Sequence, residues 1–348
     1  MVSNYRIEQL SPKDFDKWDH YAQQHAQFTI YHLTEWQQII GETFNHSSCY
    51  IIAFNCSGQV KGILPMINLS STLFGNHMLS LPYFNYGGAL SDCEEVRELL
   101  IDKAIEWSKT YKVKHLQLRD TLPVSNKLLT LNKHKVNMVL SLPKTNEQLQ
   151  KIFSSKLKSQ IKRATKEEVQ VEFGHLDLLD DFYRVFCEKM RDLGTPVYSK
   201  LFFENMLNAF PKASLITVIY WQGKPVSAGF VFFYNRKFEV PWAATLSKAN
   251  HISVNMLLYW KMIERAIDYN CLQFDFGRCT VDSGTFRFKK QWGAIPKQCY
   301  WYNWAEGSKG APDLSPANPR FNLAIKVWKK LPLLITNRLG PVIVKNLP

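Results

Sequence analysis

The sequence predicts an α/β protein made of two similar domains and a short C-terminal segment. The chain has 348 residues, which is long for one hydrophobic core and comfortable for two. Hydrophobic residues make up 46% of it, and no long tract of Ser, Pro and Gly indicates disorder. The same order of helical and β-rich patterns then occurs in each half. These observations together favour two folded domains in tandem.

The first half begins with two stretches of helical periodicity and continues with β-rich runs. Two of these runs flank a Ser-Gly pair, as the strands of a hairpin flank a turn. A further strand, a long amphipathic helix and a last strand follow. The expected elements are helices at 11–24 and 34–44, a hairpin within 49–69, a strand at 77–84, a helix at 94–111 and a strand at 114–120.

The second half has the same order of patterns. We expect helices at 177–194 and 199–210, a hairpin at 214–234, a strand at 237–245, a helix at 253–270 and a strand at 272–278. The similarity extends to phrases, since "SGQVKGILPM" corresponds to "QGKPVSAGFV". The expected domains are residues 1–140 and 141–305, each of ordinary size, followed by a Pro-rich linker and helical tail at 306–348.

Local phrases of the sequence are similar to one protein family. "LPYFNYGG", "SKLKSQIKRA", "RDLGTPVYSK", "EVPWAAT", "NMLLYW", "FDFGR" and "FKKQWGA" resemble FemAB-like proteins associated with exosortase and PEP-CTERM systems, which are grouped with BioF-like acetyltransferases. The resemblance covers nearly the whole chain, to about residue 305. It implies tandem duplicated GNAT-like domains (the acyl-CoA N-acyltransferase fold) around a shared cleft, the second domain being catalytic. It also implies transfer of an acyl or aminoacyl group to an amine of a cell-envelope or exopolysaccharide precursor.

Several other functional classes are disfavoured by the residues. Asp275-Phe276-Gly277 is a kinase tripeptide, but no G-x-G-x-x-G loop or H-R-D motif accompanies it. The seven cysteines form no C-x-x-C pair and the nine histidines no H-x-x-x-H spacing, so neither a disulfide framework nor a metal site is expected. The N-terminal stretch is polar, unlike a signal peptide, and a cytoplasmic protein is expected.

Three residues of the second half are candidate catalytic groups. In the family, a lysine in an F-K motif lies close to the transferred ester, and Phe288-Lys289 matches that motif, with Lys290 beside it. Lys289 would stabilise negative charge on the carbonyl oxygen or the leaving group. Asp275 ends a strand expected inside the sheet, and Glu239 lies beside Pro241, where a strand bulge is expected. Either carboxylate would accept the amine proton; the alternative is that both only form ion pairs.

Four further residues of the second half are candidate substrate-binding groups. Arg278 follows Asp275 and would hold a carboxylate or phosphate, or else pair with Asp275 itself. Trp242 lies on the strand with Glu239. Tyr198 and Tyr259 are weaker candidates, because aromatic residues at helical spacing are usually part of a core.

The first half offers one candidate binding segment, "LPYFNYGGAL". It places Tyr83, Asn85 and Tyr86 before Gly87 and Gly88, which would let the backbone approach a ligand closely. A plain glycine turn between strand and helix is the alternative. The family's first domain contributes to the substrate cleft, so the resemblance favours acceptor binding here.

Basic residues point to an anionic partner. The net charge is +13, which favours nucleic acid, an anionic membrane surface or a phosphorylated substrate. Lys158, Lys162 and Lys166 recur every four residues on one predicted helix face, where like charges repel unless an anion relieves them. A merely solvated face is the alternative.

No tightly bound cofactor is expected, and the donor is acyl-CoA or aminoacyl-tRNA. GNAT proteins that use CoA bind pyrophosphate through a glycine-rich loop between strand and helix. The corresponding stretch of the second half, "ATLSKANHISVNML", has no glycine, although Ser253 is suited to cap the helix. In the first half the junction contains Gly87 and Gly88, but Asp92, Glu94 and Glu95 surround the helix start, where their negative charge would repel pyrophosphate. A non-catalytic module that binds polysaccharide or nucleic acid is the competing interpretation.

The segment after residue 306 departs from the duplicated pattern. Apolar residues alternate with cations, and no acidic residue occurs after Asp313. Such a helix favours peripheral contact with the anionic inner face of a membrane. The alternative is that the segment packs back across a domain. The oligomeric state is not predicted.

Overall fold

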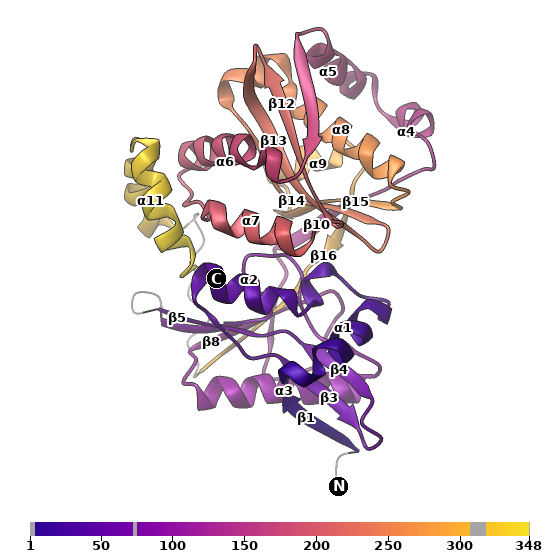
Figure 1. Cartoon of the computed structure of the whole chain (residues 1–348), viewed down its shortest axis with the longest axis vertical. Helices are drawn as coiled ribbons and strands as arrows, with labels where there is room; N and C mark the ends of the chain where they lie inside the picture. Colours follow the sequence, from indigo (N-terminus) through magenta and orange to yellow (C-terminus); the bar gives the residue numbers. More distant parts are fainter. Residues whose placement is uncertain (1–3, 72–74, 307–317, 348) are drawn as a thin grey trace. The chain divides into compact units, whose positions relative to one another are not determined.

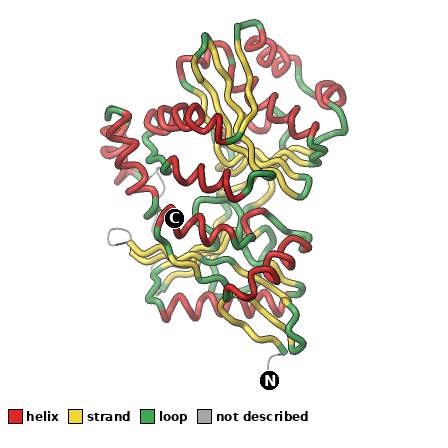
Figure 2. Tube along the Cα trace, viewed as in Figure 1, coloured by secondary structure: helices red, strands yellow, loops and turns green. Residues whose placement is uncertain are grey.

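The computed structural model describes residues 4–71, 75–306 and 318–347. The chain divides into two compact units (Figure 1). The first comprises Met1–Lys135, Gln298–Leu314 and Asn346–Pro348, and the second Val136–Lys297 and Ser315–Lys345. Each unit combines sheets with helices, as the tube in Figure 2 shows. This agrees with the predicted α/β class.

The second unit is built on a seven-stranded sheet. Its strands lie in the order β11 (Val169–Gly174), β12 (Ser214–Trp221), β13 (Lys224–Tyr234), β14 (Lys237–Thr245), β15 (Gln273–Thr280), β10 (Lys135–Ser141) and β16 (Ile295–Gln298). The connecting helices are α4 (Asn146–Ile152), α5 (Ser155–Thr165), α6 (Leu179–Leu193), α7 (Lys200–Ala209), α8 (Val254–Asp268) and α9 (Gly284–Lys290).

Helices cover both faces of this sheet. The Phe230 ring on β13 lies against Phe182 of α6 and Phe203 of α7. Val231, the next residue, belongs to the core that Leu258 and other residues of α8 help to form. Successive residues of a strand face opposite sides, so β13 is covered on both. This is why its sequence is an almost continuous apolar run instead of an alternating one.

The first unit has two sheets. One has the order β1 (Tyr5–Gln9), β3 (Ile51–Asn55), β4 (Val60–Leu64), β7 (Leu90–Ser91). The other has the order β2 (Ser47–Ser48), β5 (Ile67–Ser71), β6 (Gly75–Leu79), β8 (His115–Asp120), β17 (Tyr300–Ala305), β9 (Thr130–Asn132). The helices are α1 (Phe15–Gln24), α2 (Glu35–Phe44) and α3 (Glu94–Thr110), and apolar residues of α3 pack on β3 and β8.

The predicted order of elements matches the structure in both halves, with one strand shorter than expected. Sequence patterns predicted a strand at 77–84, but β6 ends at Leu79. Leu81 and Tyr83 adopt positive φ values of 54° and 74°, a conformation that costs a non-glycine residue about 1–2 kcal/mol and takes the chain out of the sheet. Residues 80–88 therefore form a loop.

The last strand of each half lies in the other unit's sheet. β10 follows the first half in sequence but neighbours β15, whereas β17 follows the second half and neighbours β8. The expected range 141–305 therefore contains a strand, β17, whose register is with β8: Trp301 pairs with Arg119 and Asn303 with Gln117. Within the expected tail, α10 (Asn322–Trp328) and α11 (Leu333–Val344) belong to the second unit, whereas most of the predicted Pro-rich linker lies outside the described residues.

Candidate functional site

The second unit's sheet opens between β14 and β15. The two strands pair in parallel over three residues only, ending with Glu239 opposite Asp275, and each strand then continues without its neighbour. On its other side, β14 has a bulge: Phe230 pairs with Trp242 and Phe232 with Glu239, which leaves two residues of β14 opposite one of β13. The extra residues include Pro241, as expected for a proline within a strand pattern.

Glu239 and Asp275 are brought together at this opening. Residues paired in register on neighbouring strands project to the same face of a sheet. Both side chains are fully buried. The Tyr234 hydroxyl donates a hydrogen bond of 2.7 Å to Glu239 Oε2, and the Gly277 amide donates one of 2.8 Å to Asp275 Oδ1. Burial with specific donors is the environment in which a carboxylate serves as a positioned base.

Lys289 binds the same strand end. Its Nζ donates to the Gly277 carbonyl oxygen at 2.8 Å and to the Arg278 carbonyl oxygen at 3.0 Å. The side chain is only 4% exposed. Gly277 has φ +73°, a left-handed conformation that turns the strand end and suits glycine. Asp275 thus binds the backbone amide of Gly277, and Lys289 binds its carbonyl oxygen.

The structure separates Lys289 from Lys290. Helix α9 begins after Ser283, whose hydroxyl accepts a hydrogen bond from the Phe286 amide at 3.1 Å. Along this short helix Phe286 and Lys289, three residues apart, are buried, whereas Lys290 is exposed. Of this lysine pair, the one that matches the F-K motif is the one directed inward.

Arg278 and the aromatic candidates differ in their exposure and contacts. Arg278 is exposed at the end of β15. Trp242 is half-buried, and its ring meets Tyr198 edge-on at 5.9 Å. Tyr259 instead packs on Phe276 and Phe288 in the core. Burial raises the pKa of Tyr259 to about 12, so this phenol stays neutral.

The cations of α5 lie on its outer side. Leu157 and Ala164 are buried against the core, whereas Lys158, Lys162 and Lys166 are exposed. Ser154 caps the helix through a hydrogen bond of 3.2 Å from the Leu157 amide. The predicted single-sign face is therefore formed.

In the first unit, the candidate residues Tyr83, Asn85 and Tyr86 belong to the loop at 80–88. The Tyr83 hydroxyl lies 3.1 Å from His46 Nε2, the Asn85 carbonyl accepts from Trp301 Nε1 at 3.2 Å, and Tyr86 is buried beside Tyr31. Each of the three residues thus contacts another part of the protein.

Sequence reasoning missed the residue that anchors this loop. Arg119, buried on β8, donates through its guanidinium to the Leu81 carbonyl at 3.2 Å and the Phe84 carbonyl at 2.7 Å. Its Nε donates to Gln117 Oε1 at 3.0 Å, and the Trp301 ring lies 4.4 Å from the guanidinium carbon. The available signal was an arginine inside a strand pattern, because a buried cation requires several partners.

The close approach at Gly88 is to a side chain of the same unit. A Cβ at Gly88 would lie 2.6 Å from the Cα of Asp120, so no larger residue fits. Asp120 Oδ1 accepts from the Ala89 amide at 3.0 Å. Within the described residues, Asp120 Oδ2 has no hydrogen-bond partner. Gly88 therefore packs on Asp120, and Gly87, with φ +133°, approaches the Ser80 carbonyl oxygen, so both close approaches are to protein groups, as in the alternative of a plain glycine turn.

This buried carboxyl predicts a pH dependence of stability. Burial raises the pKa of Asp120 to about 7, with Arg97 opposing the shift and Glu94 adding to it. An unfolded aspartate ionises near pH 4. Between about pH 4 and 7, Asp120 is therefore ionised in the unfolded chain but still protonated in the folded protein. The free energy of unfolding should fall over this range by up to about 4 kcal/mol from this group. Asp120→Asn should remove the fall, as measured by urea unfolding at pH 4.5 and 8. An equal pH dependence in both proteins would contradict it.

The junction between β14 and α8 is a short 3-10 helix, η4 (Ser247–Ile252). Ser253 follows it with φ +59° and makes no side-chain cap, contrary to the expectation that it caps the helix. In that conformation its hydroxyl does not reach the first amides of α8. In the first unit, Glu94 and Glu95 occupy the first turn of α3, as expected. Neither helix start offers the glycine-lined amides that cradle pyrophosphate.

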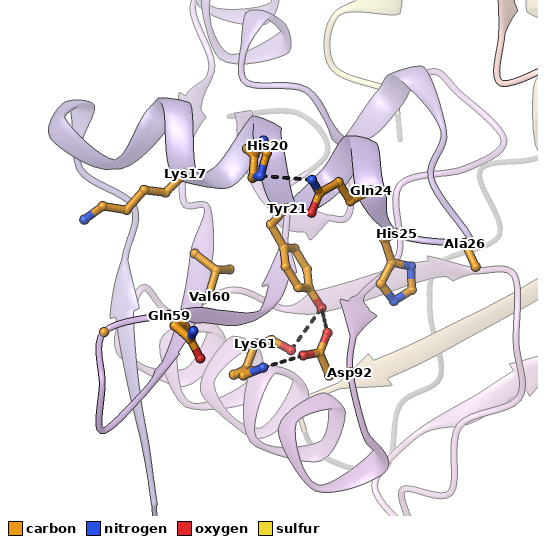
Figure 3. Close-up of a pocket in the computed structure, with 11 residues that line it drawn as sticks. Lys17, His20, Tyr21, Gln24, His25, Ala26, Gln59, Val60, Lys61 and Asp92 are labelled. Carbon is orange, nitrogen blue, oxygen red and sulfur yellow. Dashed lines mark hydrogen bonds and ion pairs between the residues drawn. The ribbon is translucent and has the colours of Figure 1, made fainter.

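A cavity of about 720 Å³ lies in the first unit beside α1 and β4 (Figure 3). Tyr21 projects into it and its hydroxyl contacts Asp92 at 2.9 Å and the Lys61 carbonyl at 3.0 Å. The two lysines that line this cavity already have acidic partners: Lys61 pairs with Asp92 at 3.0 Å, and Lys17 pairs with Asp14 at 2.8 Å. This cavity therefore offers little uncompensated positive charge for a phosphate group.

The described residues give no sign of a metal centre. Among residues 4–71, 75–306 and 318–347, no three His, Cys, Asp or Glu side chains come together in the manner of metal ligands. The chemistry available at the β14–β15 opening is that of an ammonium, two carboxyl groups and a tyrosine hydroxyl.

Comparison with known proteins identifies the fold. Residues 152–290, which include Glu239, Asp275 and Lys289, match the family model of the acetyltransferase (GNAT) domain. A crystal structure of FemX is similar with a TM-score of 0.66 and 13% identity, covering 86% of this chain and 97% of that one. The chain has the FemAB-like double GNAT fold. The predicted fold is confirmed, and the domain match supports the predicted transferase class.

Two other solved structures are similar over most of the chain. The L-PGS structure from Bacillus licheniformis has a TM-score of 0.56 and 10% identity over 96% of this chain and 98% of that one. A tandem GNAT protein from the clavulanic acid biosynthesis pathway has a TM-score of 0.55 and 8% identity over 88% and 100%. No curated protein matches the sequence. No helix in the described part of the chain is long and apolar enough to cross a bilayer.

Proposed function

We propose that the protein transfers an acyl or aminoacyl group from a carrier to an amine of a cell-envelope or exopolysaccharide precursor. The observation that supports it most is that Glu239 and Asp275 pair in register where β14 and β15 part, while Lys289 binds the Gly277 and Arg278 carbonyls further along β15. A buried ammonium and two buried carboxyl groups on this stretch of the sheet would supply charge stabilisation and a proton acceptor. All three residues lie within the range 152–290 that matches the GNAT domain model, which supports the proposal.

The reaction proposed here is direct transfer. The acceptor amine attacks the carbonyl carbon of the donor ester or thioester, and the oxygen of the tetrahedral intermediate takes the negative charge, which the Lys289 ammonium stabilises. Glu239 or Asp275 accepts the proton that the amine loses. The carbon–oxygen or carbon–sulfur bond then breaks, and the carrier leaves as an alcohol or thiol with that proton. An amide is formed, and no covalent enzyme intermediate is required.

The carrier is aminoacyl-tRNA or acyl-CoA, and two observations favour aminoacyl-tRNA. The β14–α8 junction is a 3-10 turn without glycine, which is a poor pyrophosphate cradle. The exposed lysines of α5 and the net charge of +13 favour a long polyanion. In this proposal Arg278, Trp242 and Tyr198 contact the substrates, the loop at 80–88 contributes to acceptor binding, and the protein works in the cytoplasm, where both carriers are made.

Mass spectrometry of ligands that copurify with the protein tests the donor class. RNA and CoA differ so much in mass that either is recognised at once. Recovery of tRNA esterified with an amino acid would support the proposal in its favoured form, and recovery of an acyl-CoA would redirect it to the other carrier. Recovery of a polysaccharide, together with no turnover of either carrier, would replace it with a binding role.

Neutralising the α5 lysines should weaken binding of aminoacyl-tRNA. Each phosphate contact contributes about 0.7–0.9 to the slope of log K against log salt, so Lys158→Gln, Lys162→Gln and Lys166→Gln together should reduce the slope by up to about 2–3. Filter binding from low to high salt measures it. Three exposed lysines elsewhere, Lys109, Lys112 and Lys212, give a matched control. An unchanged slope in the α5 variant would show that this face is only solvated.

A further inference from the structure

The two C-terminal helices α10 and α11 are fixed to the second unit by one side only. Thr336, Gly340 and Val344, four residues apart on α11, are buried. The helix approaches so closely that a Cβ on Gly340 would lie 2.9 Å from the Val197 amide nitrogen. Figure 1 shows α11 (yellow) beside α6. The expected alternative, packing back across a domain, is therefore realised, and the inner face of α11 is accounted for.

The outer face of the helices is apolar and exposed. On α11, Leu334 is 86% exposed and Ile335, Leu339 and Val342 are also exposed. At 100° per residue these four positions fall within one arc of about 140°, opposite the buried positions. On α10, Leu323 is 74% exposed and Val327 is exposed as well. Monomeric soluble proteins seldom display such large side chains in one stripe, so this face has the character of a binding surface.

The charged residues of α10, α11 and the turn between them are all cations. Lys326, Lys329, Lys330 and Arg338 are exposed on the same two helices and the turn between them. No acidic residue occurs in the sequence after Asp313. A large apolar stripe bordered by positive charge suits a partner with an apolar interior and an anionic surface.

We propose that this face of α10 and α11 rests on an anionic lipid surface. Lipid acyl chains accept the leucine and valine side chains, and anionic headgroups pair with the lysines and the arginine. A second copy fits less well, because a twofold interface would bring the same cations against one another. Helix α11 has 12 residues and is about 18 Å long, so it lies in the interface and cannot span a bilayer. The proposal does not depend on the transfer chemistry.

Vesicle cosedimentation of the full chain tests this surface. Wild-type protein should sediment with vesicles of 70% phosphatidylcholine and 30% phosphatidylglycerol, and much less with phosphatidylcholine alone. Lys326→Gln, Lys330→Gln and Arg338→Gln together should lower the partition coefficient roughly 100-fold, since each charge contributes about fivefold. Leu334→Ser with Leu339→Ser should lower it at least tenfold, and thermal unfolding should be unchanged because both side chains are exposed.

A matched control uses exposed apolar residues elsewhere. Leu128→Ser with Ile152→Ser removes similar surface, 56% and 68% exposed, outside the two helices, and should leave vesicle binding unchanged. The proposal is overturned if wild type fails to bind the anionic vesicles, or if Leu334→Ser with Leu339→Ser binds as well as wild type. It is also overturned if analytical ultracentrifugation shows a dimer that this double variant dissociates, since a second copy would then occupy the face.

Discussion

Replacing Lys289 with alanine is expected to lower the rate of transfer by about a hundredfold or more. This is the usual effect of removing one group that stabilises the oxyanion of an acyl transfer. The structure adds that the side chain is buried and directed to the strand end shared with Asp275. The kcat of the purified variant at saturating donor, compared with wild type, measures the effect.

The control for this prediction is the neighbouring lysine. Lys290→Ala should change kcat less than a few-fold, because Lys290 is exposed. Lys289→Ala also removes a hydrogen-bond donor from the Gly277 and Arg278 carbonyls, and an unsatisfied buried carbonyl costs about 1–3 kcal/mol. Stability is therefore measured by circular dichroism, and rates are expressed per folded molecule. Equal effects of the two substitutions would show that the functional lysine is misassigned.

Replacing Glu239 with glutamine is expected to lower kcat by about a hundredfold to ten-thousandfold if this carboxylate accepts the amine proton. Glutamine has nearly the same shape and retains an oxygen that accepts the Tyr234 hydroxyl hydrogen bond. The substitution therefore removes the basic group while largely keeping the packing. The pH dependence of kcat decides the role, because the acidic limb due to Glu239 should disappear in the variant.

Tyr234→Phe provides the matched comparison. It removes the hydrogen bond of 2.7 Å to Glu239 but keeps the carboxylate, so the acidic limb should shift and persist. If Glu239→Gln keeps full activity with an unchanged pH profile, the base is Asp275 or a substrate group. If Glu239→Gln instead unfolds the protein, Asp275→Asn provides the same test.

Most of the fold was predictable because local patterns and tertiary packing agree. The helices α3, α6 and α8 and the hairpin of β12 and β13 appear where periodicity placed them. The bulge next to Pro241 was predictable for a similar reason, since proline lacks the amide that a strand ladder needs. The choice of Lys289 over Lys290 followed from the resemblance and agrees with the burial of one side of α9.

The parts that were not predicted depend on long-range pairing. The exchange of β10 and β17 between the sheets leaves no local signal, because a strand pattern does not name its neighbour. Arg119 anchors a loop some 35 residues away in sequence, and its setting includes Trp301, more distant still. The positive φ of Leu81 is likewise imposed by surrounding contacts, since leucine does not favour it. The predicted cleft shared by the two units stays a prediction.

The most direct test of the proposed transfer is a single-turnover assay of wild type and the Lys289→Ala variant. Aminoacyl-tRNA and acyl-CoA, each labelled in the group to be transferred, are offered with an extract of envelope and exopolysaccharide precursors. Mass spectrometry then seeks an amide that carries the label. We expect a labelled amide from one of the two carriers with wild type, formed at least about a hundredfold more slowly by the variant. Binding of a precursor by both proteins, with no labelled amide from either carrier, would contradict it and indicate a module that only binds.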